Sequence, residues 1–183
     1  MARIHIPATI TDAPAASQPI LEAVNKQLGV VPNLFRLVAT SPSALAGYVG
    51  LNGALSKGAL DGATRERIAL AVAEVNGCNY CLSAHTYLGR NLAKLDETEI
   101  AANRAGRSNN AKADAAVRFA VTVTQQRGKV SEADLRAVQA AGYSDAEIIE
   151  IVGHVALNTL TNYVNEVFKT DIDFDVVEAK RAA

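Results

Sequence analysis

The 183-residue sequence has no tryptophan, few other aromatic residues and only two cysteines. Aromatic residues make up 5% of the chain, which disfavours a β-sandwich or barrel, because strands are enriched in aromatic and β-branched side chains. Two cysteines that stand three residues apart cannot staple distant loops, as the cysteines of small secreted proteins do. One close pair indicates redox or metal chemistry instead.

Charge of one sign and long apolar runs are also lacking. With 18 basic and 19 acidic side chains, the formal net charge is −1, so the chain lacks the excess of positive charge with which proteins bind nucleic acid. No run of about 18 apolar residues predicts a membrane span, and the first residues lack the apolar region of a signal peptide. We therefore expect no nucleic-acid or membrane partner and a cytoplasmic location.

The residues that are abundant favour helices. Alanine is the commonest residue, and it loses the least free energy on entering a helix. No pair of strands bounded by hairpin turns occurs. The sequence predicts an all-α, antiparallel helical bundle that forms a single domain over residues 1–183, with an extended arm at 1–18 and a charged tail or arm, partly mobile, at 171–183. Helices are expected at 20–28, 44–55, 61–76, 81–92 and 111–126. Further helices are expected to start at Pro32 and at Asp96, and after Ser131 and Ser144.

Capping boxes mark the last two predicted helices. Ser131 is followed three residues later by Asp134, and Ser144 by Glu147, each just before an apolar-periodic run. The second box opens the longest predicted helix, residues 145–168. Its apolar positions are dense enough to be buried on more than one side, either in the core or against another subunit.

The two cysteines lie where one predicted helix ends and the next begins. Gly77 ends the first helix, and Cys78 and Cys81 start the second, where unpaired backbone amides and the helix dipole favour thiolate. His85 follows four residues after Cys81, so the three side chains share one helical face. An imidazole there can take the thiol proton and return it to a leaving oxygen. The pair can cycle between dithiol and disulfide.

Three other interpretations fit parts of this pattern. The cysteines can be small apolar core residues. Cys78, Cys81, His85 and a carboxylate can bind zinc, although structural zinc sites usually take their ligands from two separated pairs, and no second pair exists here. A thioredoxin fold needs a βαβ setting, which this helical sequence does not offer. We expect neither a metal nor a cofactor.

The stretch Asn76-Gly-Cys78-Asn-Tyr80-Cys81-Leu-Ser-Ala84-His85, with Glu66 about one helix earlier, resembles the core motif of the alkylhydroperoxidase D and carboxymuconolactone decarboxylase superfamily. Residues 30–35 and 153–162 are similar to its peroxidase-related branch. The resemblance extends from about residue 28 to residue 168. It implies an alkylhydroperoxidase D-like fold, a homo-oligomer (dimer, trimer or hexamer) and peroxidase chemistry without haem or metal.

The resemblance also implies roles for five residues. Cys81 attacks the peroxide and becomes a sulfenic acid, and Cys78 resolves it as a disulfide, which a dithiol protein or a lipoyl-type carrier reopens. His85 and Glu66 form a proton relay. Tyr80 replaces the histidine of the best-characterised type, and it can donate a hydrogen bond but cannot act as a base near neutral pH.

We therefore expect a thiol-dependent peroxidase that reduces hydrogen peroxide or small organic hydroperoxides. Glu74 competes with Glu66 for the relay, because it is closer to the cysteines in sequence. Two other functions stay open: a carboxymuconolactone decarboxylase-like lactone enzyme that uses His85 without thiol redox, and a non-enzymatic redox sensor whose disulfide state alters its assembly. His154 is expected to be a core or interface residue.

Overall fold

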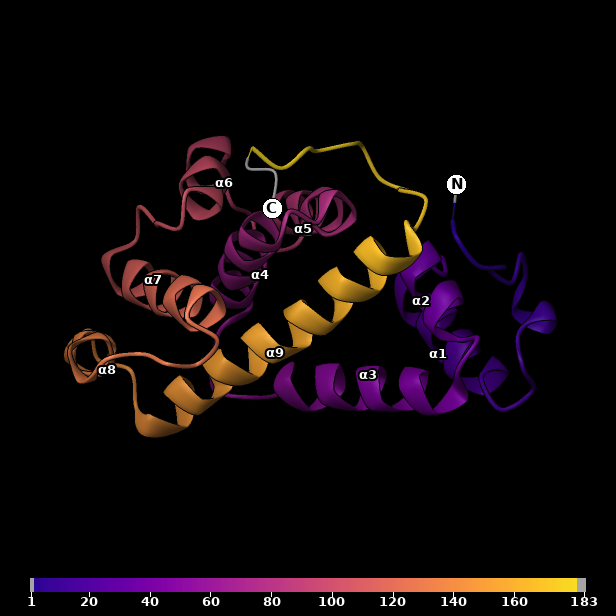
Figure 1. Ribbon diagram of the computed structural model, residues 1–183, viewed down its shortest axis with the longest axis horizontal. Helices are drawn as coiled ribbons and strands as arrows, with labels where there is room; N and C mark the ends of the chain where they lie inside the picture. Colours follow the sequence, from indigo (N-terminus) through magenta and orange to yellow (C-terminus); the bar gives the residue numbers. More distant parts are fainter. Residues whose placement is uncertain (1, 181–183) are drawn as a thin grey trace.

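The computed structural model describes residues 2–180, which fold into helices joined by short connections (Figure 1). The predicted all-α fold is confirmed, and no strand occurs within these residues. The elements in chain order are η1 (Ile10–Asp12), α1 (Gln18–Leu28), α2 (Asn33–Val38), α3 (Pro42–Leu55), α4 (Gly62–Asn76), α5 (Asn79–Asn91), α6 (Glu97–Arg104), α7 (Ala111–Gln125), α8 (Glu132–Ala140) and α9 (Asp145–Phe168). No helix within residues 2–180 has both the length and the hydropathy that crossing a membrane requires.

The helix ends agree with the predicted ones to within a turn, because they depend on local signals. At the starts of α8 and α9, the Ser131 and Ser144 side chains each accept from the backbone N–H three residues on. Asp134 and Glu147 complete the two capping boxes. At the end of α4, Gly77 takes a left-handed conformation with φ of 69°, which stops the helix.

Helix α4 is the centre of the molecule, and α5, α6, α7 and α9 all pack against it. Leu70 lies on the side of α4 opposite Ile68 and Val72, and all three are fully buried. One apolar cluster, around Leu70, includes the two cysteines. The other, around Ile68 and Val72, joins α4 to α7 and α9. This burial fixes α4, which carries Glu66, relative to α9.

The tail is not a free arm over residues 171–180, in contrast to the prediction. It runs along α5 and ends beside α6 (Figure 1). The Val177 N–H donates to Ser83 Oγ, and the Ala179 N–H donates to Asn79 Oδ1, each at 2.9 Å. Residues 181–183 of the predicted tail lie outside the described residues.

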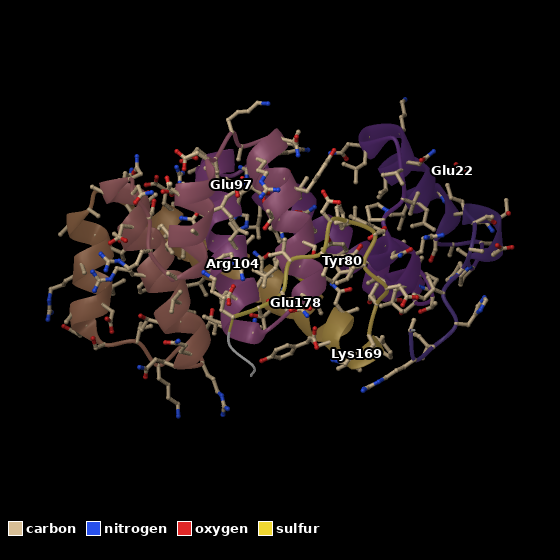
Figure 2. All side chains as sticks on the ribbon, turned by 90° about the horizontal axis from the view of Figure 1, so that it is seen from above. Glu22, Tyr80, Glu97, Arg104, Lys169 and Glu178 are labelled. Carbon is tan, nitrogen blue, oxygen red and sulfur yellow. A yellow bond between two sulfur atoms is a disulfide. The ribbon has the colours of Figure 1, made fainter. Side chains whose placement is uncertain are left out.

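A buried ion pair holds the end of the tail. Glu74 of α4 accepts from Arg104 Nε at 2.7 Å, and both side chains are largely buried. The Arg104 Nη2 donates to the carbonyl of Glu178 at 2.6 Å, and Glu74 also accepts from the Lys180 N–H at 2.5 Å. Figure 2 shows the tail running from Lys169 past Tyr80 to Glu178, beside Arg104.

A second buried carboxylate, Glu99, joins α6 to α4. It accepts from Arg67 Nε at 2.6 Å, and from Ser108 Oγ, Asn103 Nδ2 and the Asn109 N–H. Burial on its own raises the pKa of Glu99, but the hydrogen bonds from these four residues outweigh it and lower the pKa to about 2. This network holds α4 in place immediately beside Glu66.

We expect Glu99→Gln to reduce the free energy of unfolding at neutral pH by up to about 3 kcal/mol. The folded pKa of about 2 lies below the reference value of 4.5, so the carboxylate stabilises the fold fully above pH 4.5 and loses this effect as the pH falls to about 2. Urea unfolding across that pH range should show a smaller loss of stability in the variant than in the wild type. Glu97→Gln, at an exposed carboxylate of the same helix, is the control; equal pH dependence in wild type and Glu99→Gln would contradict the prediction.

Candidate active site

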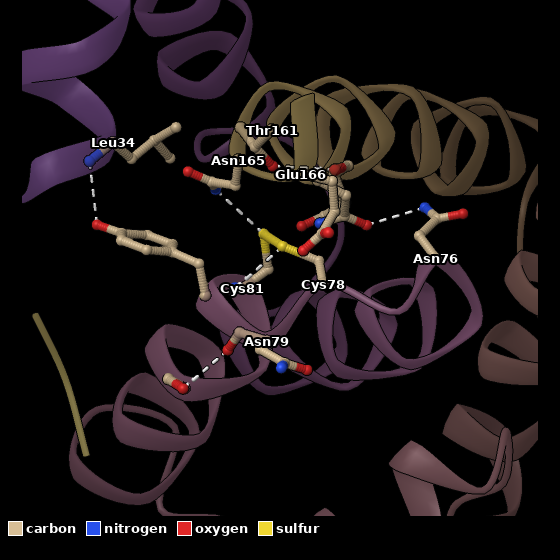
Figure 3. The surroundings of a disulfide bond; sticks show 12 residues. Leu34, Asn76, Cys78, Asn79, Cys81, Thr161, Asn165 and Glu166 are labelled. Atoms are coloured by element: carbon tan, nitrogen blue, oxygen red, sulfur yellow. Dashed lines mark hydrogen bonds between the residues drawn. A yellow bond between two sulfur atoms is a disulfide. The ribbon is translucent and has the colours of Figure 1, made fainter. Parts of the chain in front are cut away.

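The two cysteines form a disulfide at the start of α5 (Figure 3), with their Cα atoms 5.3 Å apart. Cys78 is the N-cap of α5, and its Sγ accepts from the Cys81 N–H at 3.2 Å. The Cys78 N–H itself donates to the Ala73 carbonyl of α4 at 3.0 Å. The left-handed Gly77 lets α5 begin directly after α4, and this local geometry places both sulfurs at a helix N-terminus, as predicted.

The disulfide is buried. Cys78 is 0% exposed and Cys81 is 3% exposed, because α9 passes over the start of α5 (Figure 3). The Cys81 sulfur accepts a hydrogen bond from Asn165 Nδ2 of α9 at 3.3 Å. The sulfurs are therefore enclosed between the start of α5 and the last turns of α9.

Glu66 and His85, the two residues of the expected proton relay, lie within hydrogen-bond distance of each other. The Nδ1 of His85 lies 2.8 Å from Oε2 of Glu66, and both side chains are about one-fifth exposed. A carboxylate only accepts hydrogen bonds, so Nδ1 carries the hydrogen and Nε2 of the neutral ring holds the lone pair. Glu74, the competitor in sequence, pairs with Arg104 instead. Within residues 2–180 no hydrogen bond links His85 to either sulfur, so a proton would pass between them through water.

Tyr80 lies between α5, α2 and the tail. Its ring is buried and packs edge-on against Phe174, with centroids 5.8 Å apart. Its hydroxyl accepts from the Leu34 N–H at 3.1 Å (Figure 3). Burial, assisted by the nearby Asp173 carboxylate, raises the pKa of Tyr80 above its usual value, so the phenol stays protonated at neutral pH.

Sequence reasoning missed a row of buried polar side chains on α9. Asn158, Thr161, Asn162 and Asn165 recur at helical spacing and are buried on the side that faces α4 and α5. Asn162 Oδ1 accepts from Asn76 Nδ2 at 2.9 Å. Polar residues three and four apart in an otherwise apolar helix are the signal that marks this row.

His154 belongs to the same helix face and is buried, as predicted. Burial, assisted by the Arg65 guanidinium, lowers the pKa of His154 to about 4. The ring is therefore neutral at pH 7, and its Nε2 has no hydrogen-bond partner within residues 2–180.

The side chains considered above as zinc ligands bond to one another instead. Cys78 and Cys81 bond to each other, and His85 bonds to Glu66. Over residues 2–180, no three His, Cys, Asp or Glu side chains are grouped so as to hold a metal ion.

Comparison with known proteins finds one similar family and several similar folds. Residues 42–126 match the sequence model of the Carboxymuconolactone decarboxylase family. No match is found among curated proteins. Among solved structures, the alkylhydroperoxidase AhpD core of an uncharacterized peroxidase-related protein from Ralstonia eutropha JMP134 is 24% identical, with a TM-score of 0.84 over 94% of this chain and 92% of that one.

Two further structures share the fold. An uncharacterized peroxidase-related protein from Silicibacter sp. TM1040 is 24% identical, with a TM-score of 0.79 over 93% of this chain and 91% of that one. The debrominase Bmp8, solved as a cysteine-to-alanine variant in complex with 2,3,4-tribromopyrrole, is 19% identical, with a TM-score of 0.78 over 94% of each chain. Residues 42–126 thus resemble the Carboxymuconolactone decarboxylase family in sequence, and the chain shares its fold with these three solved structures.

We expect the fold to survive reduction of the disulfide. The bond joins residues only three apart, so closing so short a loop stabilises the protein by about 2 kcal/mol at most. The free energies of unfolding in urea, measured with and without a reductant, should differ by no more than about 2 kcal/mol. The helical circular dichroism should be unchanged. The double variant Cys78→Ser/Cys81→Ser should be insensitive to the reductant, and loss of helical structure on reducing the wild type would contradict the prediction.

Proposed function

We propose that the protein is a thiol-dependent peroxidase that reduces hydrogen peroxide or small organic hydroperoxides through Cys81 and Cys78. The observation that carries the proposal is a C-x-x-C disulfide at the start of α5, followed one helical turn later by His85, which is hydrogen-bonded to Glu66 of α4. The match of residues 42–126 to the Carboxymuconolactone decarboxylase family and the fold shared with a peroxidase-related protein support it. We place the reaction in the cytoplasm, where cellular reductants keep dithiols reduced.

The chemistry balances with two thiols and one hydroperoxide. The Cys81 thiolate attacks an oxygen of the peroxide, so that an S–O bond forms as the O–O bond breaks. The leaving alkoxide or hydroxide takes up a proton and departs as an alcohol or water. The Cys78 thiolate then attacks the Cys81 sulfenic acid, an S–S bond forms, and the departing hydroxide is protonated to water. A dithiol protein or a lipoyl-type carrier reduces the disulfide again.

His85 and Glu66 supply the proton relay in this proposal. Glu66 holds the Nδ1–H of His85, which leaves Nε2 to accept the thiol proton through water and return it to the leaving oxygen. Tyr80 is the remaining residue of the proposed site. Its contacts with Leu34 and Phe174 give it the role of fixing the start of α5.

We expect one equivalent of peroxide to remove both free thiols of the reduced protein. In steady-state peroxide consumption, Cys81→Ser and Cys78→Ser should both lose turnover, because each half of the disulfide is needed. His85→Ala should lose roughly 10²- to 10⁴-fold, which is the usual contribution of a general acid–base. Glu66→Gln should lose less turnover than His85→Ala, because the imidazole of His85 is still present. His5→Ala, at an exposed histidine far from the cysteines in sequence, is the matched control.

Three outcomes would contradict the proposal. If the number of free thiols is unchanged after peroxide treatment, the function does not involve thiol oxidation by peroxide. Lactone turnover that survives in Cys81→Ser would point to the carboxymuconolactone decarboxylase-like activity, with His85 as base. One oxidation per chain without turnover, when reductant is supplied, would point to a redox sensor.

Halogenated pyrroles provide a second acceptor to test, since the debrominase Bmp8 shares the fold. The same dithiol can supply the two electrons that replace a carbon–bromine bond by a carbon–hydrogen bond, with release of bromide and formation of the disulfide. Dithiol-dependent bromide release from 2,3,4-tribromopyrrole, without peroxide consumption, would assign the chain to dehalogenation.

We also propose that the chain forms a homo-oligomer through the outer face of α9. Several large apolar side chains of α9 are exposed: Ile149, Val152, Leu160, Tyr163 and Val167. Most of them line an apolar groove of about 650 Å³ between α9 and the end of α7. Their row along one helix suits the same face of a second copy, because a two-fold contact pairs identical surfaces.

We expect Leu160→Lys to shift the protein towards monomer, because it places a charge in the middle of this apolar face. Light scattering during gel filtration measures the change in mass. Leu135→Lys changes a comparably exposed leucine on α8 and should leave the mass unchanged. A monomeric wild type, or equal effects of the two variants, would contradict the proposed interface.

A further inference from the structure

The Cys81 sulfur has one side-chain hydrogen-bond donor within residues 2–180, the Asn165 carboxamide (Figure 3). The Nδ2–Sγ distance is 3.3 Å. Asn165 is only 2% exposed, so bulk water does not compete for this contact. The Cys78 sulfur differs, because its donor is the backbone N–H of Cys81.

The orientation of the Asn165 carboxamide favours one charge state of the sulfur. With its NH₂ group towards the sulfur, it donates to the lone pairs of a thiolate or a disulfide. With its oxygen towards the sulfur, it would accept from a neutral S–H group and repel a thiolate. The structure has the first orientation, and it leaves Oδ1 of Asn165 without a hydrogen-bond partner within residues 2–180. An unpaired buried oxygen is costly, so the orientation is set by the bond to sulfur.

The other groups around the sulfurs do less to hold a negative charge there. Burial disfavours a thiolate. Glu166, which follows Asn165 on α9 and is drawn beside the disulfide in Figure 3, carries a negative charge that Lys169 pairs with at 2.6 Å. His85 of α5 bonds to Glu66 of α4, not to sulfur. The Asn165 amide is thus the one side chain of this group that donates directly to Cys81.

We propose that Asn165 is a positioning residue that holds the reduced Cys81 sulfur in its anionic form by donating a hydrogen bond from Nδ2. The proposal rests on the proposed function in one respect, the assignment of Cys81 as the attacking thiol. Asn165 stands 84 residues from Cys81 in the sequence, and α9 delivers it to the site. In this arrangement α9 borders the active site and supplies a hydrogen-bond donor to the attacking sulfur.

The test measures the pKa of the Cys81 thiol without any peroxide. In a Cys78→Ser background, where serine keeps the N-cap acceptor, Cys81 is the only thiol of the chain. The rate of iodoacetamide alkylation against pH then reports the thiolate fraction. We expect Asn165→Leu to lower the thiolate fraction below the pKa by roughly tenfold or more, since a hydrogen bond to a charged group is lost.

Asn165→Asp is the near-isosteric second variant, and it should lower the thiolate fraction at least as far, because a carboxylate cannot donate and repels the thiolate. Asn158→Leu is the matched control. Asn158 is a buried asparagine of the same helix whose Nδ2 donates to the His154 carbonyl, so its loss should leave the thiol pKa unchanged.

An unchanged thiol pKa in either folded Asn165 variant would overturn the inference, and so would an equal shift in Asn158→Leu. Circular dichroism confirms that each variant is folded. If the thiol pKa shifts as expected but the wild type consumes no peroxide, the proposed function fails and the role of Asn165 stands. If peroxide is consumed but the thiol pKa does not respond, only the role of Asn165 fails.

Discussion

The left-handed turn at Gly77 is the constraint on which the site depends. Because a left-handed residue stops α4 abruptly, α5 begins within two residues and packs back against α4. The turn makes Cys78 the N-cap of α5 and brings His85 onto the side of α4 where Glu66 lies. A residue with a Cβ would be strained at this φ of 69°. The disulfide and the histidine–glutamate pair are thus two results of one backbone reversal.

The packing of four helices around α4 is the second feature on which the site depends. Reversal alone would not fix the rotation of α4, which decides where Glu66 points. The apolar residues that follow Glu66 on α4 are buried, four helices pack against α4, and Arg67 is held by Glu99 of α6. Packing therefore fixes Glu66 to the accuracy that a hydrogen bond to His85 requires.

Local features could be predicted from the sequence, and tertiary ones could not. Ser144 and Gly77 act through their own backbone neighbours, so the helix ends they mark were predictable. Cys78, Cys81 and His85 share one short segment, so their common face followed from helical spacing. The pairing of Glu66 with His85 was implied only by the family resemblance.

The contact of Asn165 with Cys81 and the position of the tail could not be predicted from the sequence. The contact between Asn165 and Cys81 depends on how α9 crosses α5, and helical periodicity gives no crossing angle between distant helices. The tail contains few of the signals that mark regular structure, and its position depends on backbone hydrogen bonds to Ser83, Asn79 and Glu74. Such bonds use side chains that look like ordinary surface polar residues in the sequence.

The enclosure of the disulfide by α9 and the tail has a consequence for biosynthesis. A ribosome makes the chain from its N-terminus, so the cysteines of α5 emerge long before the parts that cover them. During that interval, the sulfurs lack the Asn165 donor and the helix that buries them. The nascent chain therefore exposes both thiols to the cell until α9, the last helix of the described chain, has docked. The site is therefore completed only after α9 has been made and has docked on α5.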